Sequence, residues 1–399
     1  MKQLSVMVKP ASSLCNMRCR YCFYTDVSHM RSTESYGIMS IETAKAVIAN
    51  VWRDLEDGDE ITIAFQGGEP LLAGLDFFRF FAEEALRQPV KANISWALQT
   101  NGALIDDDWC AFFKAHGFLV GLSLDGDSEL HNQNRRFASG NGTFKRVMQA
   151  KRLMDINKVE YNILSVLTNE SARHPQRFWS FMLKEKIHYV QFIPCLGALG
   201  REPGSDAAPL STASSRPGAS SRPDAASRQD ASYLTLTPKR FYSFYSGLFP
   251  LWQKEAAGGN YISVRLFDDI VNLFVGERVT SCGLTGVCHP QYIIEADGGV
   301  YPCDFYVLDE FRAGSMTEIG MREAFDRMAA GGFLQDKPAL PDSCAGCGYL
   351  KACNGGCKRM RGAIYDDGNG FCGYRAFLDE NLDALCRTGI MLMRSAGRK

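Results

Sequence analysis

Short β-rich runs alternate with amphipathic helical stretches over the first half of the chain. The candidate strands are SVMVKP (5–10), ITIAFQG (61–67), ISWALQT (94–100), LVGLSLDG (119–126), YNILSVLT (161–168) and VQFIPC (190–195). Between them, apolar residues recur at helical spacing in stretches such as 41–56, 75–86 and 143–156. Strand–helix alternation predicts parallel strands with right-handed crossovers. Six such units predict an α/β fold, a partial (β/α)6 TIM-type barrel.

The polar stretches of this half fall where the predicted strands end. QGGEP ends the second strand, QTNG the third and SLDG the fourth. In barrels of this type the chemistry lies at the C-terminal ends of the strands. The sequence therefore predicts a site at this edge of the sheet.

Composition divides the remainder of the chain. Residues 200–232 are rich in Ser, Ala, Pro and Arg, with no aromatic residue and one leucine, so they predict a disordered insertion. We therefore expect a barrel domain over 1–199, the insertion over 200–232, a helical connection over 233–280 with a helix at 238–256, and a loop-rich C-terminal domain over 281–399 that ends in a helix.

Bulk properties exclude several classes of protein. The net charge of −1 argues against a nucleic-acid binder that relies on a basic field. No apolar run of 18 residues predicts a membrane span, and the first 15 residues do not resemble a signal peptide. These features predict a cytoplasmic protein. In a reducing compartment the 14 cysteines are expected to be metal ligands or catalysts rather than disulfides.

Eleven cysteines form two patterned groups. Cys15, Cys19 and Cys22 share one short segment, one ligand fewer than a structural zinc site needs. The second group is Cys282, Cys288, Cys303, Cys344, Cys347, Cys353, Cys357 and Cys372. Eight thiolates can ligate two 4Fe–4S clusters or two zinc ions, and spacing alone leaves both open. Cys110 and Cys386 are expected to be core residues, and Cys195 ends a predicted strand.

These motifs together resemble a known family. C-x3-C-x2-C with Tyr21 before the last cysteine, followed by GGEP at 67–70, resembles the radical S-adenosylmethionine signature. Cys288, Gly298 and Cys303 in C-x9-G-x4-C, with the later C-x2-C-x5-C-x3-C and final cysteine, resemble its iron–sulfur (SPASM-type) extension. KPASSLCNMRCRYCFY, FQGGEPLLAGLDFF, HNQNR and YPCDFYVL closely resemble anaerobic sulfatase-maturating enzymes.

The resemblance implies a reaction and its cofactors. Such enzymes oxidise one Cys or Ser of a sulfatase to Cα-formylglycine with a 5′-deoxyadenosyl radical, and they use S-adenosylmethionine and three 4Fe–4S clusters. Cys15, Cys19 and Cys22 would hold the cluster whose open iron binds S-adenosylmethionine. One auxiliary cluster would use Cys282, Cys288, Cys303 and Cys357, and the other would use Cys344, Cys347, Cys353 and Cys372.

The family resemblance also implies which residues form the site and which partners the protein has. Asp304, directly after Cys303, would be the catalytic base. The expected S-adenosylmethionine contacts are Tyr21, Gly68, Ser123, Arg135 and Leu196, although without the motif Arg135 reads as a solvated surface arginine and Ser123 as a turn residue. The substrate would be a sulfatase polypeptide with a C/S-x-P-x-R motif, with Tyr24 near it. A flavodoxin or ferredoxin would be the reductant. Asp268 and Asp269 are rival bases, expected to face solvent or the barrel rim.

Three other interpretations remain at this stage. A SPASM-type enzyme can instead form thioether or carbon–carbon crosslinks in another peptide. A zinc scaffold with purely structural cysteines predicts a colourless protein. A non-catalytic iron–sulfur electron-transfer protein predicts a brown protein that does not cleave S-adenosylmethionine.

Overall fold

The computed structural model describes residues 2–199, 233–277, 279 and 281–396. The predicted insertion at 200–232 lies outside them. The chain forms two compact units. The first unit contains Met1–Leu124, His131–Leu164 and Cys288–Lys337, and the second contains Asp125–Leu130, Ser165–Val287 and Pro338–Lys399. The domain boundaries expected from composition stay a prediction.

Parallel strands build the first unit, as the alternation predicts. They are β1 (Gln3–Val8), β2 (Glu60–Phe65), β3 (Asn93–Thr100), β4 (Leu119–Ser123) and the beginning of β5 (Tyr161–Leu167). Each strand pairs in parallel with the next in sequence. The strands therefore present their carboxyl ends at one edge, where the polar stretches follow them.

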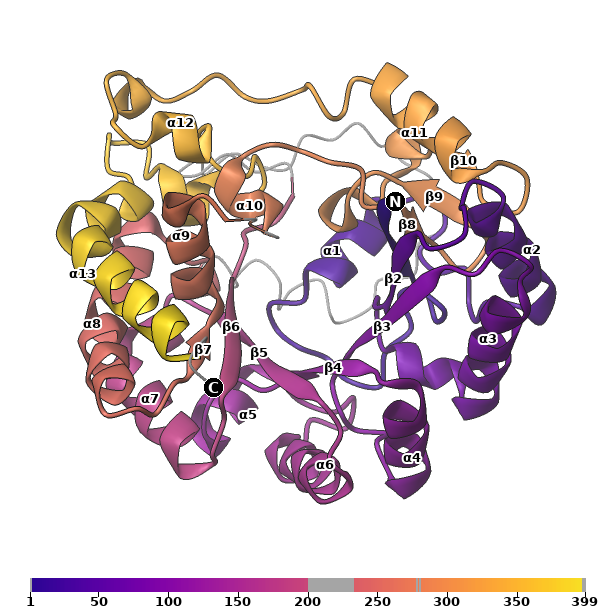
Figure 1. Ribbon diagram of the computed structural model, residues 1–399, viewed down its shortest axis with the longest axis horizontal. Helices are drawn as coiled ribbons and strands as arrows, with labels where there is room; N and C mark the ends of the chain where they lie inside the picture. Colours follow the sequence, from indigo (N-terminus) through magenta and orange to yellow (C-terminus); the bar gives the residue numbers. More distant parts are fainter. Residues whose placement is uncertain (1, 200–232, 278, 280, 397–399) are drawn as a thin grey trace. The chain divides into compact units, whose positions relative to one another are not determined.

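Helices connect these strands and pack beside one another. They are α1 (Phe23–His29), α2 (Ile41–Trp52), α3 (Leu75–Arg87), α4 (Asp107–His116), α5 (Ser128–Asn134) and α6 (Phe144–Asn157), with a short η1 (Pro70–Ala73). Ser40 and Asp106 cap α2 and α4 by accepting backbone N–H bonds. Figure 1 shows α3 and α4 on one side of strands β2 to β4. The helices expected over 41–56, 75–86 and 143–156 are confirmed.

Aromatic side chains fill the space between these strands and helices. Phe65 of β2 contacts Phe78 and Phe81 of α3, with ring centroids 4.8 and 5.2 Å apart. Trp96 of β3 stacks on Phe118 at 5.6 Å. All five side chains are buried, so burial of large apolar area stabilises this half of the sheet.

A C-terminal segment extends the sheet beyond β1. β8 (Ile293–Ile294) pairs in parallel with β1, and β9 (Gly299–Tyr301) and β10 (Gly314–Ser315) follow in antiparallel order. Short helices η5 (Asp304–Tyr306), η6 (Asp309–Phe311) and α11 (Met321–Ala330) complete the segment. A buried ion pair joins Arg31 Nη1 to Glu295 Oε1 at 2.6 Å. Residues 288–337 thus belong to the same compact unit as the three-cysteine segment.

The second unit is mainly helical. It contains η2 (Ser171–Arg173), α7 (Pro175–Lys184), β6 (Tyr189–Pro194), α8 (Pro238–Ala257), β7 (Ser263–Val264), α9 (Arg265–Val275), α10 (Cys282–Thr285), η7 (Asp342–Cys344), α12 (Leu350–Cys353), η8 (Arg361–Tyr365) and α13 (Gly373–Ala396). Phe267 of α9 stacks on Phe377 of α13, with centroids 5.8 Å apart. α8 confirms the helix expected over 238–256.

In the described part of the chain, none of the helices combines the length and apolar character that a membrane crossing requires.

Candidate functional site

The three clustered cysteines lie on the loop between β1 and α1. All three are half-buried, and Cys22 is the residue before α1 begins. The Met17 N–H and the Asn101 side-chain amide lie 3.4 and 3.7 Å from Cys15 Sγ. Burial raises the pKa of the Cys15 thiol to about 11, so this side chain keeps its proton until a metal displaces it. A loop with three thiols fits a cluster that has three protein ligands.

The GGEP loop packs directly on that cysteine loop. Gly68 N–H donates to Ser12 O at 2.9 Å, and Glu69 N–H donates to Leu14 O at 2.7 Å. A Cβ at position 68 would stand 2.1 Å from Leu14 O. Only glycine permits the backbone of the GGEP loop to lie this close to Leu14. The GGEP loop and the segment before Cys15 therefore pack as one rigid unit.

The Glu69 side chain connects the GGEP loop to the end of β3. Its carboxylate is fully buried and accepts from Leu71 N at 3.0 Å, Thr100 Oγ1 at 2.8 Å and Asn101 N at 2.8 Å. Burial raises the pKa of Glu69 to about 7, while the three donors pull it down. These hydrogen bonds hold the GGEP loop in its orientation.

We predict that Glu69→Gln destabilises the protein by about 1–3 kcal/mol. The amide nitrogen cannot accept, so one buried N–H or hydroxyl loses its partner. Thermal unfolding of the variant measures the loss. The exposed Glu83→Gln on α3 is the matched control, and equal melting temperatures for the two variants would contradict the role of Glu69.

Asp304 lies in a buried polar cluster at the carboxyl ends of β1 and β2. Its side chain contacts Lys9 (Nζ to Oδ1, 3.0 Å), Tyr24 (Oη to Oδ2, 2.6 Å) and Gln66 (Nε2 to Oδ2, 3.3 Å). Asp304 is 7% exposed and Lys9 is 2% exposed. Burial and the Asp304 carboxylate raise the pKa of Tyr24 well above its ordinary value, so the phenol donates to the carboxylate.

One oxygen of Asp304 keeps an open acceptor position. Lys9 Nζ forms an ion pair with Oδ1 at 3.0 Å, and Oδ1 has no further hydrogen-bond partner among the described residues. A carboxylate oxygen has two lone pairs, so Oδ1 keeps an acceptor position beside the ammonium. Asp304 is therefore anchored through Oδ2 and can receive a proton or donor through Oδ1.

The local fold explains how this cluster forms. Lys9 directly follows β1 and Gln66 directly follows β2, so parallel pairing brings them to the same edge. Asp304 comes three residues after the end of β9, which runs antiparallel to β8. Asp304 and Tyr24 were predicted from the sequence, whereas Lys9 and Gln66 were missed. Both residues directly follow adjacent parallel strands, and this position in the sequence could have identified them as site residues.

The other expected cofactor contacts of the first unit are largely buried. Arg135 is 7% exposed, and its guanidinium carbon lies 5.4 Å from the Tyr21 ring centroid. It is therefore not a solvated surface arginine. His131 contacts Thr143, whose hydroxyl donates to Arg135 O at 3.1 Å. Ser123, at the end of β4, accepts from Gln99 Nε2 at 2.9 Å.

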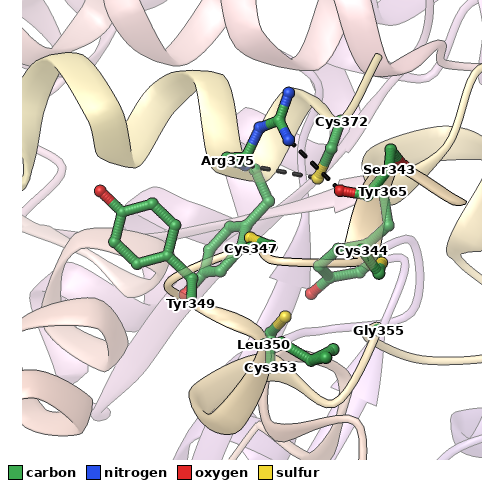
Figure 2. Close-up of a pocket in the computed structure, with 11 residues that line it drawn as sticks. Ser343, Cys344, Cys347, Tyr349, Leu350, Cys353, Gly355, Tyr365, Cys372 and Arg375 are labelled. Carbon is green, nitrogen blue, oxygen red and sulfur yellow. Dashed lines mark hydrogen bonds between the residues drawn. The ribbon is translucent and has the colours of Figure 1, made fainter. Parts of the chain in front are cut away.

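Four thiols of the second unit line one pocket. Figure 2 shows Cys344, Cys347, Cys353 and Cys372 around it, with Tyr365 and Arg375. The Arg375 N–H donates to Cys372 Sγ at 3.4 Å, and its guanidinium donates to Ser343 O at 3.2 Å. Thiols that line a common pocket fit a multi-iron cluster, because its irons bind thiolates on different sides.

The remaining candidates are divided between the units. Cys288 and Cys303 belong to the first unit, and Cys282, Cys357 and Leu196 to the second. Their assignment to one auxiliary cluster and to the cofactor stays a prediction. Among the unassigned cysteines, Cys110 and Cys195 are buried and Cys386 is half-buried.

The expectation that Asp269 faces solvent was wrong. Asp269 is 3% exposed and does not face solvent. It accepts from Arg265 Nε at 2.9 Å and from the Ser281 hydroxyl. These contacts tie α9 to the residue before Cys282.

Comparisons with known proteins agree with the motifs. Residues 10–177 match the radical SAM superfamily, and residues 287–348 match an iron–sulfur cluster-binding domain. The chain is 35% identical to the cysteine-type anaerobic sulfatase-maturating enzyme of Clostridium novyi, over 96% of this chain and 97% of that protein. It belongs to the anaerobic sulfatase-maturating enzymes.

Other members of this family are also similar over most of the length of this chain. The serine-type enzyme of Bacteroides thetaiotaomicron is 29% identical over 92% of this chain and 85% of its own. The solved structure of native anSMEcpe with bound AdoMet and Cp18Cys peptide has a TM-score of 0.81 at 33% identity, covering 98% of this chain and 99% of that one. The predicted radical SAM α/β fold with a parallel sheet and a SPASM C-terminal domain is thereby confirmed.

Proposed function

We propose that this member of the family oxidises a Cys or Ser residue of a sulfatase to Cα-formylglycine and so activates the sulfatase. The observation that carries the proposal is the buried Asp304 cluster, in which a carboxylate with one open acceptor oxygen is fixed beside the three-cysteine loop. A peptide substrate must lose a heteroatom proton in this reaction, and a positioned carboxylate is a suitable acceptor.

The cofactors are S-adenosylmethionine and three 4Fe–4S clusters. When bound, they supply the hydrogen-atom abstraction at the target Cβ and an acceptor for the second electron. We assign Cys15, Cys19 and Cys22 to the first cluster and keep the two auxiliary ligand sets expected from the resemblance. Tyr21, Gly68, Ser123, Arg135 and Leu196 are our proposed contacts to S-adenosylmethionine.

The chain's own residues handle the proton. Asp304 Oδ1 takes the thiol or hydroxyl proton of the target residue, because Oδ2 is already engaged by Tyr24 and Gln66. The Lys9 ammonium holds the carboxylate in place at 3.0 Å. Tyr24 and Gln66 fix Oδ2 and Lys9 fixes Oδ1, so the remaining acceptor position of Oδ1 is held in a defined place, as positioned acid–base catalysis requires.

The substrate of this member is a peptide, and its finer identity is part of the proposal. A cysteine target is favoured, since the cysteine-type relatives are 35–37% identical and the serine-type relatives 29%. We further propose a C/S-x-P-x-R motif, a flavodoxin or ferredoxin reductant, and a cytoplasmic location, where a reducing environment preserves thiolate ligands.

An anaerobic assay tests this function. The protein, with its clusters reconstituted, is mixed with S-adenosylmethionine, dithionite and one of two peptides that differ only in Cys or Ser at the target position. Mass spectrometry is expected to show an aldehyde on the Cys peptide together with 5′-deoxyadenosine. A thioether or carbon–carbon crosslink, or cofactor cleavage that leaves both peptides unchanged, would overturn the proposed function.

A further inference from the structure

The pocket of Cys344, Cys347, Cys353 and Cys372 contains a buried hydroxyl that the protein does not satisfy. Tyr374 lines this pocket and is 1% exposed. Its Oη has no hydrogen-bond partner among the described residues. Buried hydroxyls are nearly always hydrogen-bonded, so a bound group is expected to complete the bond.

We propose that the Tyr374 hydroxyl donates a hydrogen bond to a sulfur atom of the cluster in this pocket and raises its reduction potential. The inference rests on the proposed function, which assigns these four cysteines to an auxiliary cluster. Tyr374 is not one of the cysteine ligands, and its proposed role is to set the reduction potential of the cluster.

The neighbouring tyrosine provides an internal comparison. Tyr365 lines the same pocket, and its ring centroid lies 5.6 Å from that of Tyr374. Its hydroxyl, however, donates to Gly283 O at 2.9 Å. A Cβ at Gly356 would stand 2.1 Å from the Tyr365 ring, so this ring is closely packed. Of the two buried phenols, only Tyr374 lacks a protein acceptor.

The groups around Tyr374 leave sulfur as the acceptor. The Arg375 side chain has only donors; its guanidinium donates to Ser343 O, and the backbone N–H of Arg375 donates to Cys372 Sγ. The Asp269 carboxylate acts on Tyr374 through its charge, and it already accepts from Arg265 and Ser281. The negatively charged acceptors in the lining are the four cysteine thiolates and, once a cluster is bound, its sulfides. Ser343 Oγ is also without a partner, but Ser343 is only half-buried, so it is a weaker candidate.

The direction of the effect follows from charge. Reduction adds one negative charge to the cluster, and a hydrogen bond to its sulfur stabilises that charge. Hydrogen bonds to cluster sulfurs are one of the established determinants of iron–sulfur potentials. Tyr374 therefore makes this auxiliary cluster a better electron acceptor than its cysteines alone would.

A redox titration of the full-length holoprotein, followed by electron paramagnetic resonance, tests the inference. Tyr374→Phe removes only the hydroxyl, so one auxiliary cluster is expected to titrate at a more negative potential while the other clusters do not shift. Tyr365→Phe is the matched control, with no comparable shift. An unchanged potential in Tyr374→Phe with full iron content would overturn the inference.

Two further measurements keep the test decisive. If Tyr374→Phe does not retain its clusters, electron–nuclear double resonance on the reduced wild-type protein is used. It is expected to detect an exchangeable proton coupled to an auxiliary cluster in addition to the Arg375 N–H at Cys372 Sγ, and absence of this second proton overturns the inference. Cys344→Ala with Cys347→Ala tests the assignment itself. Undiminished iron content in that variant would refute the ligand set, independently of the role of Tyr374.

Discussion

Asp304→Asn is expected to lower the rate of formylglycine formation by about 10²–10⁴-fold, the contribution typical of a positioned acid–base group. That range corresponds to about 3–5 kcal/mol of activation free energy. Asparagine keeps the shape of the side chain, and its amide oxygen can still accept from Tyr24. It cannot take up the substrate proton at the position of Oδ1, which is the open oxygen of the native carboxylate.

The measurement separates proton transfer from radical formation. Peptide aldehyde and 5′-deoxyadenosine are quantified in the same reactions. The variant should still form 5′-deoxyadenosine, because Asp304 is not among the proposed cofactor contacts. Glu310→Gln, an exposed carboxylate six positions later, is the control. Aldehyde formation by Asp304→Asn at the wild-type rate would show that another group accepts the proton.

Replacement of Cys15, Cys19 and Cys22 by alanine together is expected to abolish cleavage of S-adenosylmethionine. The loop then has no thiol to hold the first cluster, while the eight later cysteines are unchanged. Iron content should fall by about four of roughly twelve atoms, as expected for loss of one 4Fe–4S cluster of three. The protein should remain brown.

Iron analysis and 5′-deoxyadenosine assays, run in parallel, test this expectation. Cys386→Ala removes a half-buried thiol outside both patterned groups and is the control. It should keep full iron content and activity. Retained cofactor cleavage in the triple variant would place the reactive cluster elsewhere in the chain.

The sequence predicted the elements of the first 195 residues closely, because their periodicity is strong. β1 to β6 overlap all six expected strands. The extension of the sheet by β8 was not predictable in the same way. β8 has two residues, Ile293 and Ile294, which is too short for any period, and its partner β1 is distant in sequence.

The candidate site shows a similar division. Asp304 was found because it follows a patterned cysteine, a signal carried by neighbouring residues in the chain. Lys9 and Gln66 were missed because their role depends on pairing between β1 and β2 and on the return of the β8–β9 hairpin. Burial of Arg135 likewise comes from its tertiary surroundings, since HNQNR is polar and reads as surface. Tertiary contacts, and not the residue types of a sequence motif, decide the roles of Lys9, Gln66 and Arg135.

The pairing of β8 with β1 also has a consequence for how the protein is made. Met7 pairs with Ile293, so the two partners are 286 positions apart in the chain. At typical translation rates of about 5–20 residues per second, roughly 15–60 s pass between synthesis of the two strands. Contacts this distant in sequence form late, because the chain must close a long loop first. The three-cysteine loop therefore leaves the ribosome well before Asp304, and a nascent or truncated chain carries the thiols without the carboxylate that completes their site.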